Sequence, residues 1–169
     1  MNIARSIRRF GLPFRPVGAE DGYLYLTHTP LYLYILTAFT YIFGENILFL
    51  RLTTVGFSIG SISLVYLIVR GSKNKTSASV ATLLLAINPF WALYSFYIYM
   101  EIPMCFFALL SIYFLLKKEE TKKEGYYIGV GGAVALSVLV KEFAILFWFA
   151  LTIYVVLFAS KWREKIVGL

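Results

Sequence analysis

The sequence has 169 residues, of which 60% are hydrophobic, 18% aromatic and only 15% charged. A soluble globular domain averages about 45–50% apolar and about 25% charged residues, so this composition excludes a water-soluble enzyme and a disordered segment. The net charge of +7 comes from basic residues that flank apolar runs, a pattern that does not indicate nucleic-acid binding. One cysteine excludes an intrachain disulfide, and one histidine excludes a histidine-cluster metal site.

Residues 1–29 are predicted to form an external basic arm and loop, and residues 30–169 a transmembrane helical domain. No apolar core follows the arginines of the arm, so the arm is not a secretory signal peptide. Residues 30–43 are apolar and predict a helix with Thr29 as its N-cap, Pro30 as its first residue and Gly44 as its C-cap. The length of this helix favours an interfacial position, whereas the arginines before it favour a crossing that leaves the arm in the cytoplasm.

The remainder of the chain predicts an all-α integral membrane protein. Apolar runs between charged residues indicate about five transmembrane helices, near 47–70, 77–97, 101–117, 125–140 and 142–160. Pro89 interrupts the second run and predicts that this helix is kinked there or that its outer turns are broken. The glycine pairs Gly56/Gly60 and Gly125/Gly129 match the GxxxG pattern, which favours close packing between helices of this chain over dimerisation.

Positive charge follows every second predicted helix. The basic residues therefore fall on one side, which the positive-inside rule makes cytoplasmic (Arg70, Lys73, Lys75; Lys117, Lys118, Lys122, Lys123; Lys161, Arg163, Lys165). Glu101 and the Lys141-Glu142 pair then lie on the outer side, near a predicted aromatic interface band (Trp91, Tyr94, Tyr97, Tyr99).

Three residues of this outer side have a structural and a functional interpretation. Glu101 is either a carboxylate favoured by a helix dipole or a functional ionisable group at the membrane surface. Lys141 is either a snorkelling residue of a charged turn or a cation for an anionic substrate. His28 precedes a helix, where an isolated histidine is more often a polar linker residue than a ligand.

Five short segments, in this order, resemble one family of membrane enzymes. They are ARSIRRFGLPF at 4–14, YLTHTPLY at 25–32, FGENILFLRL at 43–52, YMEIP at 99–103 and VKE at 140–142. Together they are similar to glycosyltransferases with the C-type membrane fold that use polyprenyl- or dolichyl-phosphate sugars, such as protein O-mannosyltransferases and aminoarabinose transferases. In that family a juxtamembrane helix lies in the first external loop, which favours an interfacial position for residues 30–43.

The resemblance implies transfer of a hexosyl or pentosyl unit from a polyprenyl-phosphate donor to a protein, lipid or glycan acceptor, on the extracytoplasmic face of the cell membrane. It implies that Glu101 is a catalytic-site carboxylate that orients the acceptor or helps to hold a cation. Lys141 would contact the donor phosphate, assisted by Arg5 or Arg8, and His28 would contact a metal or the donor phosphate. A divalent cation stays open as a cofactor, because one histidine and one carboxylate form only part of a metal site.

The family also has a first transmembrane helix and an acidic pair before the segment that corresponds to residues 4–14. We therefore expect the sequence to be the N-terminal part of a longer enzyme, with its first helix, first catalytic acid and C-terminal part elsewhere, and little activity from the chain by itself. The alternative is a non-catalytic helical membrane subunit or a transporter fragment. In either case membrane lipids are partners and nucleic acid is not.

Overall fold

A computed structural model describes residue 7 and residues 14–17, 21–24 and 29–158. The elements of this part of the chain are two strands and seven helices, namely β1 (Phe14–Val17), β2 (Asp21–Leu24), α2 (Leu31–Phe43), α3 (Ile47–Ser72), α4 (Lys75–Ala86), α5 (Pro89–Phe96), α6 (Glu101–Thr121), α7 (Tyr126–Val140) and α8 (Ala144–Phe158).

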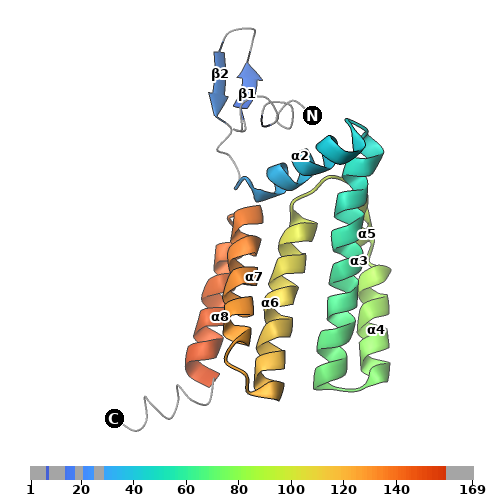
Figure 1. Cartoon of the computed structure of the whole chain (residues 1–169). Helices are drawn as coiled ribbons and strands as arrows, with labels where there is room; N and C mark the ends of the chain where they lie inside the picture. The colour runs from blue at the N-terminus through green and yellow to red at the C-terminus, as the bar shows by residue number, and fades with distance from the viewer. Residues whose placement is uncertain (1–6, 8–13, 18–20, 25–28, 159–169) are drawn as a thin grey trace.

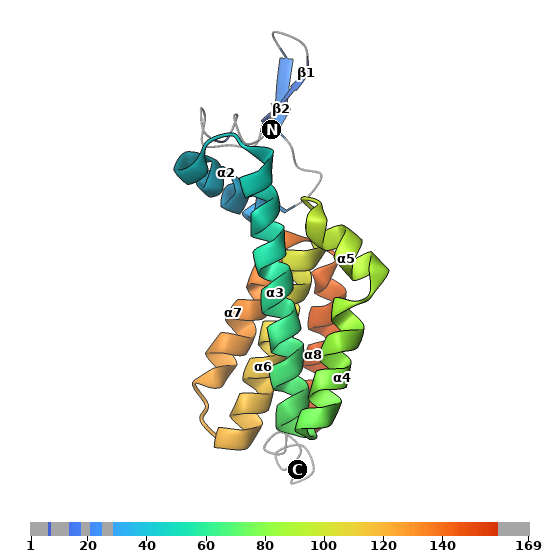
Figure 2. The same cartoon turned by 90° about the vertical axis from the view of Figure 1, so that its right-hand side faces the viewer.

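Helices α3, α4, α6, α7 and α8 run alongside one another, and α2 lies across one end of this bundle (Figure 1). Helix α6 packs against α3 on one side and against α7 on the other, and α3 also packs against α4 (Figures 1 and 2). The α3–α4 and α6–α7 turns lie at the end opposite α2, whereas the α5–α6 and α7–α8 connections lie at the α2 end (Figure 1). The two ends of the bundle therefore differ in the connections that they carry.

The all-α prediction describes the bundle, and the hairpin is an element that the sequence analysis did not predict. Strands β1 and β2 pair antiparallel, with Phe14 opposite Leu24 and Val17 opposite Asp21. This hairpin falls inside the basic arm that the sequence predicted at residues 1–29.

The predicted helix near 77–97 is two helices, α4 and α5, whose axes differ by 60°. The break falls at Ile87 and Asn88, directly before Pro89, as the proline predicted. Proline has no N–H to donate to the preceding turn, so it starts a helix instead. The Asn88 side chain caps this start by accepting a hydrogen bond from the N–H of Trp91 at 3.0 Å.

The prediction of five membrane-spanning helices is not confirmed. Of the described helices, α3 is long and apolar enough to cross a membrane by itself, and the bent pair α4 and α5 passes the same criterion together. Helices α7 and α8 have 15 residues each. At the usual rise, 15 residues extend about 22 Å, less than the ~30 Å hydrocarbon core of a bilayer. Helix α6 has 21 residues, but charged side chains fill its last turns.

Helix α2 starts one residue later than predicted. Pro30 is the N-cap and Leu31 the first helical residue, so the prediction of Thr29 as the cap is wrong. The prediction of Gly44 as the C-cap is confirmed, and its φ of 72° is a conformation that favours glycine. The position of α2 across the bundle end is the geometry expected of an interfacial helix (Figure 1).

A hydrophobic cluster fixes α2 on the bundle. Its buried members are Tyr32 and Leu36 of α2, Leu50 of α3 and Val140 of α7. Partly buried side chains from the same helices, from α6 and from the α5–α6 connection surround it (Leu31, Phe39, Phe57, Ile98, Met100, Met104, Phe107). Burial of these apolar side chains stabilises the docking of α2, since each fully buried large side chain contributes about 1.5–3 kcal/mol.

Two of the four GxxxG glycines allow aromatic rings to approach a neighbouring helix. A Cβ atom at Gly60 would lie 2.7 Å from the Phe106 ring of α6, and a Cβ atom at Gly129 would lie 2.9 Å from the Phe114 ring. Gly56 and Gly125 have nothing within 4 Å of the corresponding position. The predicted packing role is therefore confirmed for Gly60 and Gly129.

Replacement of Gly60 by leucine tests this packing. We expect Gly60→Leu to lower the free energy of unfolding by about 1–3 kcal/mol, because the larger side chain must displace the Phe106 ring. Gly56→Leu, one turn away on α3, is the matched control and should leave stability unchanged or raise it. Thermal unfolding of the two variants in detergent provides the comparison. Equal stabilities would contradict the proposed contact.

Candidate functional site

Glu101 and Lys141 come from two helices that meet at the α2 end of the bundle. Glu101 is the first residue of α6, and Lys141 is the C-cap of α7. Because α6 and α7 are antiparallel neighbours, the start of one lies beside the end of the other (Figure 1). The Lys141 ammonium forms an ion pair with Oε1 of Glu101. The structure therefore brings together two of the predicted site residues, 40 positions apart in the sequence.

Short-range packing explains why these two side chains meet. Ile102 and Pro103, which follow the glutamate, are almost completely buried and anchor the first turn of α6. The Ser137 hydroxyl of α7 donates a hydrogen bond to the Met104 carbonyl of α6 at 2.9 Å. Lys141 leaves the helix in an extended conformation, while its N–H donates to the Ser137 carbonyl at 3.1 Å. Both backbones are thus fixed relative to each other.

The pair lies at the edge of the bundle and is not buried within it. The Lys141 side chain is 17% exposed and the Glu101 side chain 37% exposed. The Lys141 ammonium also lies 5.7 Å from the centroid of the Phe143 ring. A carboxylate at a helix N-terminus is stabilised by the helix dipole, and an ammonium is a point-charge partner for phosphate oxygens. The arrangement offers a hydrogen-bond acceptor and a cation side by side.

Arg51 and three tyrosines occupy the same end of the bundle. The Arg51 guanidinium lies 5.8 Å from the centroid of the Tyr97 ring, and its side chain is exposed. Tyr99 contacts Tyr94 and Tyr97 edge to face, with centroids 4.9 and 5.9 Å apart. Three of the four aromatic residues predicted as an interface band therefore form one cluster. The guanidinium–Tyr97 contact was not predicted, because the two residues lie on different elements.

Tyr32 lies at the same end of the bundle. The sequence analysis includes it in the YLTHTPLY segment but gives it no role. Its side chain is completely buried, and its hydroxyl forms a hydrogen bond with the Thr54 hydroxyl of α3 at 2.6 Å. Burial raises the pKa of the Tyr32 phenol to about 12, although the bond to Thr54 opposes this shift. The phenol is therefore neutral at physiological pH, and its role is to tie α2 to α3.

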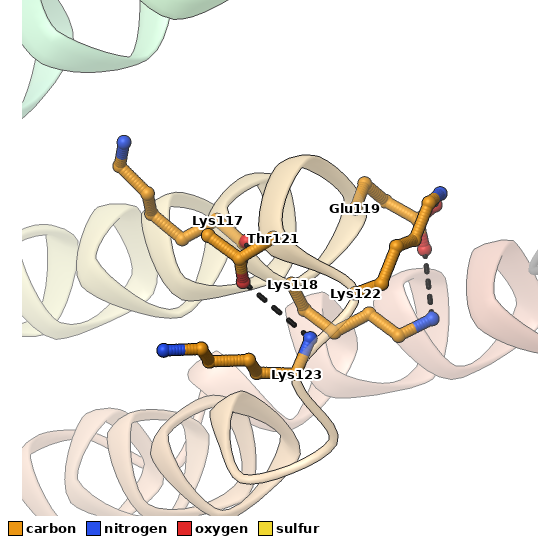
Figure 3. A network of polar contacts seen from close by, with 6 residues as sticks. All are labelled: Lys117, Lys118, Glu119, Thr121, Lys122 and Lys123. Atoms are coloured by element: carbon orange, nitrogen blue, oxygen red, sulfur yellow. Dashed lines mark hydrogen bonds and ion pairs between the residues drawn. The ribbon is translucent and has the colours of Figure 1, made fainter.

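The opposite end of the bundle carries the basic turns. At the α6–α7 turn, Glu119 forms ion pairs with Lys118 at 3.0 Å and with Lys122 at 3.4 Å, and Figure 3 draws these three residues. Lys117 pairs with Glu120 at 2.7 Å. The hydrogen bond from Lys118 lowers the pKa of the Glu119 carboxyl. The Lys118 side chain is buried, with its ammonium 4.7 Å from the Tyr127 ring centroid.

The α3–α4 turn, which adjoins Arg70, Lys73 and Lys75, lies at the same end as the α6–α7 turn (Figure 1). The structure thus places these two basic sets together, as the sequence predicted, and away from Glu101 and Lys141. The third basic set lies outside the described residues.

Arg5, Arg8 and His28, the other predicted site residues, lie outside the residues that the structure describes. Among the described residues, no group of three or more histidine, cysteine, aspartate or glutamate side chains could hold a metal ion. The described part of the site therefore consists of the Glu101–Lys141 pair and the aromatic residues around it.

The described residues thus form a bundle of apolar helices with a further helix across the end that carries the charged pair, and α3 and the bent pair α4 and α5 could cross a membrane by length and composition. Residues 27–169 match the family described as dolichyl-phosphate-mannose-protein mannosyltransferase, and the chain belongs to this family of C-type membrane glycosyltransferases. The resemblance stated from the sequence is confirmed. Comparisons with curated proteins and with solved structures give no match.

A double-mutant cycle tests the contact between α2 and α3. Tyr32→Phe and Thr54→Val each remove one partner of a buried hydrogen bond, and each should lower the free energy of unfolding by about 0.5–1.5 kcal/mol. The double variant should cost less than the sum of the two, because the second change leaves no further unpaired hydroxyl. Denaturant unfolding of the four proteins provides the cycle, and strict additivity would contradict the bond.

Proposed function

We propose that the chain takes part in transfer of a hexosyl or pentosyl unit from a polyprenyl-phosphate donor to a protein acceptor. The observation that carries this proposal is the Glu101–Lys141 pair at the α2 end of the bundle, in a member of the mannosyltransferase family. Protein acceptors follow from the family description, and lipid or glycan acceptors are alternatives for the same chemistry.

The reaction exchanges one bond to the anomeric carbon for another and moves one proton. An acceptor hydroxyl oxygen attacks the anomeric carbon, the bond from that carbon to the phosphate oxygen breaks, and lipid phosphate leaves with the bonding electrons. The hydroxyl proton passes to a carboxylate base, and positive charge must stabilise the departing phosphate. Glu101 accepts a hydrogen bond from the acceptor hydroxyl and orients it, and Lys141 neutralises the phosphate.

The residues outside the described part of the chain enter the proposal through the sequence resemblance. Arg5 and Arg8 are proposed to assist Lys141 at the donor phosphate. His28 is proposed to contact the same phosphate or a metal ion bound there. Both roles add positive charge at the leaving group, which is where the reaction develops negative charge.

The α2 end is proposed to face the extracytoplasmic side of the cell membrane. Two basic turns at the other end support this orientation, because cytoplasmic connections are enriched in lysine and arginine. The tyrosines near Arg51 support a position of the α2 end at the membrane surface, since tyrosine is enriched at membrane–water interfaces. A lipid-linked donor would therefore present its phosphate at the level of Lys141.

Glu101→Gln tests the proposed role of the carboxylate. We expect sugar transfer from a radiolabelled polyprenyl-phosphate donor to fall about 10²- to 10⁴-fold, the range typical of a lost acid–base or orienting carboxylate. The substitution is made at the chromosomal locus with an affinity tag, so that the protein is purified as the cell produces it. Insertion into the membrane should be normal.

Glu45→Gln is the matched control, because Glu45 is exposed, lies in the α2–α3 connection at the same end, and loses the same charge. This variant should retain its activity. Near-wild-type transfer by the Glu101→Gln protein would remove Glu101 from the site.

A further inference from the structure

The ammonium assigned to the donor phosphate is already engaged in the structure. Lys141 holds Glu101 in an ion pair, and its Nζ also faces the Phe143 ring, so little of the lysine is exposed. A phosphate that approaches Lys141 therefore meets an ammonium whose charge is largely compensated. Binding of a phosphate to Lys141 must therefore change the contact between Lys141 and Glu101.

The backbones on both sides of the pair are held in place, so backbone movement does not separate Lys141 from Glu101. Val140, which precedes the lysine, is completely buried, and Ile102, which follows the glutamate, is 1% exposed. The hydrogen bond from Ser137 to Met104 ties the two helices together next to the pair. The freedom that remains is in the two side chains, because the lysine has a long flexible stem and the glutamate is 37% exposed.

Two anions beside one ammonium repel each other. A phosphate within contact of Lys141 would lie only a few ångströms from the Glu101 carboxylate, and like charges at such distances raise the free energy of the complex in a partly desolvated site. The conflict is relieved when the lysine turns to the phosphate and the carboxylate turns away. The Glu101 side chain has space for that movement because 37% of it is exposed.

We propose that donor phosphate and Glu101 compete for Lys141, so that donor binding releases the Glu101 carboxylate for the acceptor. This inference rests on the proposed function and adds an order of substrate binding to it, in which the donor binds before the acceptor. Before the donor arrives, the ion pair holds the carboxylate away from an acceptor hydroxyl. The same pair therefore positions both groups and keeps the site inactive without donor.

Competition makes an unusual prediction about affinity. Removal of the carboxylate in Glu101→Gln should tighten binding of a polyprenyl monophosphate by about three- to tenfold, the effect of removing one partly exposed like charge. Lys141→Met should weaken binding of the same probe at least tenfold. Binding is measured with the full chain in nanodiscs of zwitterionic lipid, and Glu45→Gln should bind as the unmodified protein does.

The outcomes separate this inference from the proposed function. If the unmodified protein binds the probe, Lys141→Met does not, and Glu101→Gln binds equally or more weakly, competition is wrong while the phosphate site stands. If the unmodified protein gives no saturable binding, or if Lys141→Met binds the probe with the same affinity, both the competition and the proposed phosphate site are wrong. Thermal unfolding checks that each variant is folded. Glu101→Asp has a shorter side chain that holds Lys141 less well. It must therefore shift the affinity for the probe in the same direction as Glu101→Gln.

Discussion

The ion pair between Glu101 and Lys141 depends on how α6 and α7 pack, and the function proposed for the α2 end depends on that pair. Helix α6 lies between α3 and α7, and Gly60 and Gly129 let its phenylalanine rings approach both neighbours. This close packing sets the register in which the first residue of α6 meets the C-cap of α7. A shift by one turn, about 5.4 Å, would separate carboxylate and ammonium beyond contact.

Helix α2 complements this arrangement because it lies across the bundle instead of along it. Its buried face docks on α3 and α7 through Tyr32 and Leu36, while Tyr41 and Ile42 are exposed. A helix in this position can lie at the membrane surface with its exposed apolar side chains in the headgroup region. The charged pair is then close to the depth at which a lipid phosphate is found. The two ends of the bundle differ, because one end carries this ion pair and the other carries the basic turns.

Much of the fold follows from local sequence signals. The apolar runs predict the helices to within a few residues, except that the run near 77–97 is two helices, α4 and α5, separated just before Pro89. The number of membrane spans was not predictable in the same way. Helices α7 and α8 are too short, and α6 is too charged at its end, to pass as membrane spans by themselves. An apolar run gives the approximate length of a helix, but it does not show whether that helix crosses the bilayer.

The sequence indicates two of the residues that meet at the α2 end of the bundle, but it does not indicate their contact. Glu101 and Lys141 were identified because charge next to long apolar runs is unusual, but their direct contact was not, since it depends on the register of two helices. Tyr32 and Thr54 give no sequence signal for their hydrogen bond, because a tyrosine and a threonine in apolar helices are common. The pairing of β1 with β2 is also not predicted by the sequence analysis, which treats residues 1–29 as an arm and loop.

The most direct test of this account is the side of the membrane on which each end of the bundle lies. Cys105 is the single cysteine, so its replacement by alanine gives a background for single cysteines at Tyr99, near the ion pair, and at Lys123, in the α6–α7 turn. A membrane-impermeant maleimide should label position 99 in intact cells and position 123 only after permeabilisation. Labelling of both positions from one side, or of position 123 alone in intact cells, would contradict the account.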